Sequence, residues 1–117
     1  MSQPARQAAD QTVNPWAGEV ALVIDGQRRV MKLTLGALAE LDASLGADSL
    51  VALVERFETG RYRTADVLKL LLAGLRGGGW RVGAAALMDA EIAGGPAAAA
   101  RAAALLLARA FALPDEG

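Results

Sequence analysis

The sequence predicts an α+β fold that is mainly α, with an N-terminal β-hairpin followed by a bundle of about four to five helices. Three observations predict it. A β-branched run over 19–24 leads into Asp25-Gly26, leucines recur at helical spacing over 35–76, and 54% of the 117 residues are hydrophobic. This composition is sufficient for a hydrophobic core, and the length is typical of a single domain, which we expect over 14–113.

The hairpin is expected over about 19–33. Its two strands flank Asp25-Gly26, a strong turn signal because glycine adopts positive φ without steric cost. Apolar residues alternate along the strands, which leaves an apolar face on each: Val20, Leu22 and Ile24 on the first, Met31 and Leu33 on the second. Because an isolated hairpin is marginal in water, it must pack on helices or on the strands of another subunit.

Two amphipathic helices are expected next, over about 35–45 and 49–58. Thr34 precedes the first, and Asp48 or Ser49 precedes the second. Side chains of these types accept hydrogen bonds from the first free amides of a helix, so they predict where each helix begins.

A third helix is expected over about 65–76, with Thr64 as its cap and Asp66 placed favourably against the helix dipole. Its apolar side chains cover most of the circumference: Val67, Leu68, Leu70, Leu71, Leu72 and Leu75. A helix this apolar should be central, or should face a partner as well as its own core.

The last two helices are expected over about 82–92 and 96–112. The glycines at 77–79 separate the fourth helix from the third, and Pro96 is suited to the first turn of the fifth. We expect three apolar residues of the fourth helix to point inward: Leu87, Met88 and Ile92.

Composition and charge exclude several classes of protein. Twelve Lys and Arg residues against thirteen Asp and Glu residues give a net charge of −1, so no global basic field exists for nucleic acid or an acidic membrane. With no His and no Cys, disulfides, Cys- or His-based zinc sites and cysteine nucleophiles are excluded, and we expect no cofactor.

No membrane segment is expected. The Ala- and Leu-rich stretch 96–113 is interrupted by Arg101 and Arg109, whereas a span needs about 20 predominantly apolar residues. We therefore expect a cytoplasmic protein. The polar ends are interpreted as a flexible N-terminal tail over 1–13 and a polar C-terminal end over 114–117.

No motif predicts an enzyme. The glycine-rich segment 77–83 follows a helix rather than a strand and lacks the spacing of a phosphate loop. Asp89 and Glu91 do not face each other at i,i+2 spacing, and Glu40 has no evident acidic partner, so solvated helix faces explain these carboxylates.

The second and third expected helices could form a helix-turn-helix, which is a DNA-binding motif. Four basic residues surround the third helix: Arg61, Arg63, Lys69 and Arg76. The connector over 60–64 is long for this motif, and the third helix is too apolar to lie in a DNA groove. Nucleic-acid binding is thus retained only as a weak alternative.

A protein-binding surface is the sharpest functional signal in the residues themselves. Two tryptophans flank loops, and the third helix carries more leucines than one core side needs. We expect the surface to include Trp16, Leu68, Leu71, Leu72 and Trp80, with the leucines supporting self-association or contact with a partner.

Several segments resemble a family of small proteins from gene transfer agents of alphaproteobacteria and related tailed phages. They are Asn14-Pro15-Trp16-Ala17-Gly18-Glu19-Val20, Asp25-Gly26, Leu33 to Leu41, Leu75-Arg76-Gly77-Gly78-Gly79 and Ala90 to Pro96. Members of this family are described as tail assembly chaperones, and also as tail tube proteins. The resemblance carries no catalytic residues.

The resemblance implies a non-enzymatic role in building a tail. A tail assembly chaperone would bind the tape measure protein, a long helical polypeptide, and would release it as tail tube subunits polymerise. The first alternative is a structural tail tube subunit, and the second is a small helical DNA-binding regulator. A homo-oligomer and contact with the tail tube protein are further expectations.

Overall fold

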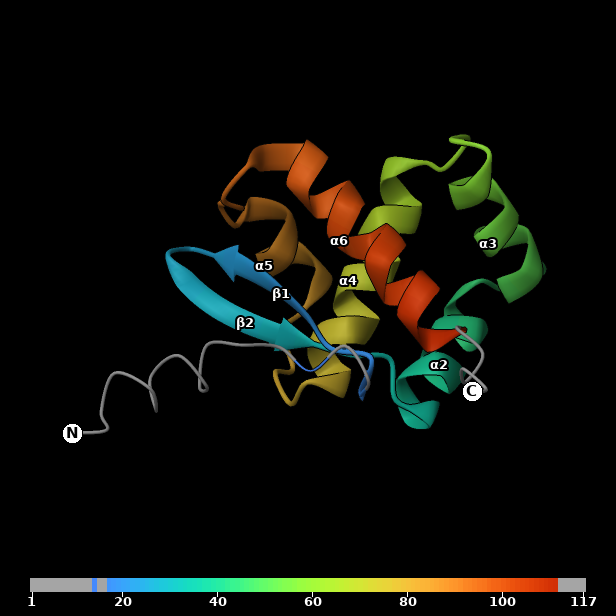
Figure 1. The fold of residues 1–117 in the computed structure, drawn as a ribbon, viewed down its shortest axis with the longest axis horizontal. Helices are drawn as coiled ribbons and strands as arrows, with labels where there is room; N and C mark the ends of the chain where they lie inside the picture. Colours follow the sequence, from blue (N-terminus) through green and yellow to red (C-terminus); the bar gives the residue numbers. More distant parts are fainter. Residues whose placement is uncertain (1–13, 15–16, 112–117) are drawn as a thin grey trace.

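The computed structural model describes residue 14 and residues 17–111. Trp16, the expected tail over 1–13 and the polar end over 114–117 therefore lie outside the described residues. The elements in chain order are β1 Val20–Ile24, β2 Gln27–Met31, α2 Leu35–Ser44, α3 Leu50–Glu58, α4 Thr64–Gly77, α5 Ala84–Asp89 and α6 Gly95–Ala110 (Figure 1). This order confirms the predicted mainly helical fold with an N-terminal hairpin.

Helix α4 is the centre of the described fold. It packs against α2, α5, α6 and strand β2, and the hairpin and α3 lie on opposite sides of it (Figure 1). Two of its leucines, Leu70 and Leu75, are almost completely buried. The apolar circumference of this helix is thus used mainly for contacts within the chain, which confirms the central position expected from its sequence.

The hairpin forms around the predicted turn. Asp25 and Gly26 adopt φ values of 52° and 78°, and the two antiparallel strands pair from Val20↔Met31 to Ile24↔Gln27. Positive φ at both central residues matches the right-handed twist of the flanking strands, which is why Asp-Gly favours a two-residue turn. The apolar face of β1 and Met31 of β2 are buried against the helices.

Another part of the chain bonds along the outer edge of β1. Just beyond the end of β2, the amide of Lys32 donates to the carbonyl of Gly74 at 3.1 Å. On the β1 side, the amide of Asp25 donates to the carbonyl of Glu91 at 2.7 Å, and Ala93 donates to Val23 at 3.0 Å. These bonds satisfy backbone groups that would otherwise be free to pair with another strand.

The fourth predicted helix is shorter than expected. Helix α5 covers only Ala84–Asp89 rather than 82–92, and Ile92 forms an isolated bridge with Ile24 instead of a helical turn. The backbone at 91–93 is committed to the edge of β1, so it cannot also continue a helix. Periodicity within 82–92 could not reveal this long-range pairing.

Side-chain caps fix the starts of two helices as predicted. The hydroxyl of Thr34 accepts from the amide of Ala37 at 3.1 Å, and that of Ser49 accepts from Ala52 at 3.0 Å. The start of α4 differs, because Arg63 occupies the cap position and Thr64 is already helical. Asp66, at the third position of the helix, accepts from the backbone amide of Arg63 at 2.8 Å, which is the reciprocal bond of a capping box and not the cap bond expected of Thr64.

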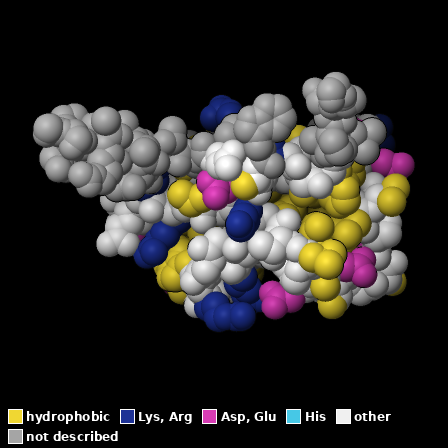
Figure 2. Space-filling model, turned by 60° about the horizontal axis from the view of Figure 1, so that its bottom comes forward, with side chains coloured by type: hydrophobic (Ala, Val, Ile, Leu, Met, Phe, Trp, Pro, Cys, Tyr) yellow, Lys and Arg dark blue, Asp and Glu magenta, His cyan; other side chains and the backbone are white. Residues whose placement is uncertain are grey.

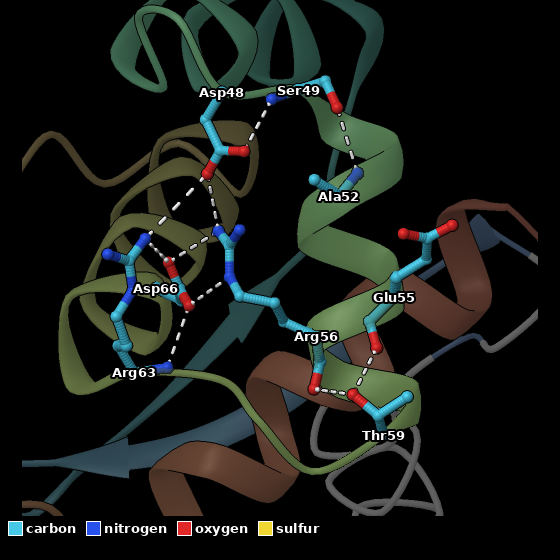
Figure 3. Close-up of polar contacts among 8 residues, drawn as sticks. All are labelled: Asp48, Ser49, Ala52, Glu55, Arg56, Thr59, Arg63 and Asp66. Atoms are coloured by element: carbon cyan, nitrogen blue, oxygen red, sulfur yellow. Dashed lines mark hydrogen bonds and ion pairs between the residues drawn. The ribbon is translucent and has the colours of Figure 1, made fainter.

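A buried carboxylate joins α3 to α4 (Figure 3). Asp66 is 1% exposed, and its two oxygens accept from Nε and Nη2 of Arg56 at 2.9 and 3.0 Å. Arg56 also pairs with Asp48 at 2.8 Å, and Arg63 approaches Asp66 at 3.5 Å. The cluster thus ties α3 and the loops at its two ends to the first turn of α4.

The electrostatics of this cluster favour the charged forms. Burial alone would raise the pKa of Asp66, but hydrogen bonds from Arg56 and from the Arg63 amide outweigh it and leave that pKa below its ordinary value. The hydrogen bond from Arg56 likewise lowers the pKa of Asp48. Both carboxylates raise the pKa of Arg56 in turn.

Candidate functional site

A groove of about 770 Å³ lies between α4, α5 and the first turns of α6. We call it the α4–α5–α6 groove. Its side chains are mostly apolar: Val67, Leu68 and Leu71 from α4, Leu87 and Met88 from α5, Ile92 from the following loop, and Pro96, Ala97, Ala99 and Ala100 from α6. The groove therefore offers apolar contact along three sides.

The groove has a buried floor and an exposed rim. Leu71 and Leu87 are only 2% and 3% exposed, whereas Met88 is 66% exposed. Leu68 lies between these extremes. An exposed methionine beside buried leucines is suited to binding a partner's side chains, because methionine is flexible and adapts to irregular surfaces.

The α6 wall of the groove is built from small residues. The alanines of its first turns project little beyond the helix backbone, so the groove stays open at this side. Small side chains allow another backbone to approach a helix closely. This wall is consequently better suited to the flank of a second helix than to a single bulky anchor.

Polar chemistry in the groove is sparse. Among the described residues that line it, Tyr62 and Thr64 are the only ones with a polar side chain. Specific small-molecule sites usually add several convergent polar groups to an apolar pocket. The lining therefore favours binding of an apolar protein surface over recognition of a polar substrate.

The structure separates the residues predicted for the partner surface. Leu68 and Leu71 both line the groove, whereas Leu72 and Trp80 do not. Leu72 is half-buried against the core. Trp16 lies outside the described residues. Whether any of these residues contacts a partner remains a prediction.

The expectation that the side chain of Leu71 is exposed is wrong. Leu71 faces the core and only floors the groove, because α6 and α5 close over this side of α4. The sequence also predicts an inward-pointing Met88, yet this side chain is exposed. Leu87 and Met88 are adjacent on one short helix, so only one of them can face the core, and Leu87 does.

Trp80 covers the core instead of lining the groove. It lies after the C-terminal end of α4, is half-buried, and packs against the hydrophobic cluster. The guanidinium carbon of Arg29 lies 3.8 Å from the centroid of its ring. The sequence does not predict this contact between Arg29 and Trp80, because the two residues are far apart along the chain and only the fold brings them together.

Two features are absent from the described part of the chain. None of its helices is both long and apolar enough to cross a membrane. Over the same residues, no group of three or more Asp, Glu, His or Cys side chains is arranged to hold a metal ion.

Comparison with known proteins places the chain in a family. A family model described as "phage tail tube protein, GTA-gp10" matches residues 17–113, which include the hairpin, all the described helices and the groove. No curated protein and no solved structure matches the chain. The match confirms the resemblance to a gene transfer agent and phage tail family. This protein therefore belongs to the phage tail tube protein, GTA-gp10, family.

Proposed function

We propose that this phage tail protein acts as a tail assembly chaperone and that it binds a helical segment of the tape measure protein in the α4–α5–α6 groove. The observation that carries the proposal is this groove, with its buried leucine floor, exposed Met88 and low alanine wall. An amphipathic helix that lays its apolar face into such a groove is a common mode of recognition.

The chemistry of the groove supports a reversible, non-catalytic role. Its lining excludes water from a partner's apolar side chains but places no charged side chain at the centre. Burial of apolar area would stabilise the complex by about 25 cal/mol per Å² before the entropy of association is subtracted. Such a complex can keep a helical client soluble and still release it during assembly, which we place in the bacterial cytoplasm.

A structural tail tube subunit is the second candidate, and the description of the matching family favours it. Tube subunits resemble one another in being rich in strands that pair between subunits. In the described part of this chain the sheet has two strands, and Glu91 and Ala93 of the same chain bond along the outer edge of β1. This arrangement supports the chaperone over the tube subunit.

The DNA-binding regulator is the weakest candidate. Helix α4, which would have to enter a major groove, packs against four other elements. Near the start of α4, the basic side chain of Arg63 lies 3.5 Å from the carboxylate of Asp66, within the ion-pair cluster that also includes α3. A recognition helix needs an accessible face, so this packing argues against the motif.

Co-purification with the tape measure protein tests the proposed function. In co-expression with an untagged tape measure fragment, we expect the tagged wild-type chain to retain it. Met88→Asp should reduce the retained fragment about tenfold or more, because it places a charge in an apolar interface. Leu35→Asp is the matched control, since Leu35 is 85% exposed and lies outside the groove.

The two variants make the outcome specific to the groove. Both should keep the helical circular dichroism of the wild type, because both replace exposed side chains. Equal loss of the fragment in Met88→Asp and Leu35→Asp would place binding elsewhere. Failure of the wild type to retain any segment of the tape measure protein would refute the chaperone itself.

A further inference from the structure

A second apolar hollow lies beside α6, between its C-terminal half and α3. Its volume is about 360 Å³, and we call it the α3–α6 cleft. Val54 and Phe57 of α3 form one wall, and Ala104 and Ala108 of α6 form the other, together with Phe111 directly after that helix. Phe111 is 46% exposed, so this end of the cleft is open to solvent. The cleft thus resembles the α4–α5–α6 groove in its chemistry.

An alanine stripe on α6 runs through both hollows. Ala97 and Ala100 line the groove, and Ala104 and Ala108 line the cleft. Their spacing of three or four positions places all four on one face of the helix. Each of them is exposed or half-buried. The two hollows therefore share one wall, which stays low along its whole length.

Two stacked aromatic rings join the hollows on the side opposite this stripe. Phe57 lines the cleft, Tyr62 lines the groove, and their ring centroids lie 4.6 Å apart with an angle of 7° between the ring planes. Tyr62 is 39% exposed. Because the two rings are in direct contact, the groove and the cleft meet at this stack. Apolar surface thus continues from α4, across the rings, to α3.

We propose that the groove, the aromatic stack and the cleft form one binding surface, the α6 track, and that a single helical segment of the tape measure protein occupies all of it. The inference rests on the proposed function, since it extends the site in which that function places the client. From Ala97 to Phe111 the track is about 21 Å long, at about 1.5 Å per residue. A client needs about four helical turns to fill it, whereas about two turns would fill the groove alone.

The lining of the track specifies the apolar face of this client. Glu58, in the cleft, is the only charged side chain among the described residues that line either hollow. A charge in the middle of the client's apolar face would meet the two rings and lose its hydration. The expected client therefore carries an unbroken apolar stripe over about four turns, and it tolerates a Lys or Arg only at the end that reaches Glu58.

Exposed apolar side chains also occur outside the track. Leu35 on α2 and Val51 on α3 are both largely exposed. Figure 2 shows that hydrophobic side chains gather mainly on the side of its face away from the hairpin. An apolar peptide that adheres to such side chains would bind without entering the track. A test must therefore report on the groove, the cleft and α2 separately.

Single-cysteine variants provide these three reporters, because the chain has no cysteine of its own. Ala97→Cys in the groove, Glu58→Cys in the cleft and Asp42→Cys on α2 all replace exposed residues. Each variant of the full chain is labelled with an environment-sensitive fluorophore and titrated with overlapping tape measure segments of about 20 residues, long enough to form a helix. We expect one segment to shift the emission at positions 97 and 58 with Kd values that agree within about twofold, and to leave position 42 unchanged.

The outcomes separate this inference from the proposed function. A shift at position 97 without one at position 58 would keep the chaperone, confine its client to the groove and overturn the α6 track. Absence of a shift at both positions with every segment would overturn both proposals. A shift that follows addition of the unlabelled chain alone would assign the track to a second copy, which also overturns the inference.

Ala108→Glu tests the cleft without a label. It places a charge beside the apolar wall of the cleft and should weaken binding of the segment about tenfold, as measured by the shift at position 97. Ala43→Glu is the matched control, because both alanines are exposed and lie in the last turn of a helix, and its affinity should stay within about twofold of wild type. Equal affinities of Ala108→Glu and Ala43→Glu would overturn the inference.

Discussion

Asp66 shows how one residue gains a role that its sequence position does not reveal. Its place in the first turn of α4 predicts a favourable interaction with the helix dipole, and its contact with the Arg63 amide fulfils that expectation. The pairing with Arg56 spans ten positions and a loop, so no local pattern indicates it. Local capping can be predicted from sequence, whereas a buried ion pair between helices depends on how they pack.

Asp66→Asn should lower the free energy of unfolding by about 2–3 kcal/mol, because it leaves Arg56 without its buried partner. The loss is smaller than for a fully buried pair, since Arg56 keeps Asp48 and remains partly accessible to solvent. Urea unfolding at neutral pH measures the difference. Asp42→Asn, at an exposed position of α2, is the control, and a loss of equal size there would contradict the account.

The same carboxylates predict how stability depends on pH. The folded-state pKa values of Asp66 and Asp48 lie below the ordinary value of 3.8, so the unfolded chain takes up protons first as pH falls. Their contribution is complete at neutral pH, begins to decline below about pH 5 and is lost as pH passes through the folded-state values. The melting temperature, measured at a series of pH values from neutral to acid, should fall less steeply with decreasing pH in Asp66→Asn than in wild type.

At the scale of elements, the hairpin depends on a close approach to the end of α4. A Cβ on Gly77 or Gly78 would overlap the carbonyl oxygens of Lys32 and Val30, respectively. In the sequence these glycines mark only a helix stop. Their second role is to let β2 and Lys32 lie close against the end of α4, and the sequence does not predict it because it depends on a contact between distant segments.

Gly78→Ala should therefore destabilise the protein by about 1–3 kcal/mol, the usual cost of forcing an extra carbon into a packed contact. Gly36→Ala is the matched control, because Gly36 is helical and exposed and a Cβ there meets nothing closer than 4.0 Å. This control should be neutral or stabilising by about 0.5–1 kcal/mol. Denaturant unfolding of both variants checks the prediction, and equal stability of Gly78→Ala and wild type would contradict the close approach.

Helices and strands are predicted correctly where neighbouring residues specify them, and incorrectly where contact with a distant segment decides the structure. Thr34, Ser49 and Asp25-Gly26 specify their own caps or turn, and the structure places the corresponding elements within a few residues. Helix α5 was predicted too long because 91–93 pairs with β1. The sequence predicts only part of the groove: it places Leu68 and Leu71 at a partner surface, but it predicts neither the exposed Met88 nor the alanine wall.

At the scale of the whole molecule, the hairpin and helices share one hydrophobic cluster and leave the apolar α4–α5–α6 groove at the surface. The groove supports the proposed helical client, and the bonds of Glu91 and Ala93 along β1 leave less of the hairpin edge for pairing with strands of another subunit. Both features support the proposed chaperone, and the tube subunit is the alternative that the next experiment separates from it.

Light scattering coupled to size-exclusion chromatography tests this distinction most directly. The purified full chain would be measured alone and after mixing with a soluble helical segment of the tape measure protein. The account predicts a small species of fixed mass alone and a discrete complex with the segment, which Met88→Asp abolishes and Leu35→Asp preserves. Growth of the isolated chain into rings or tubes, with no complex formed, would contradict it.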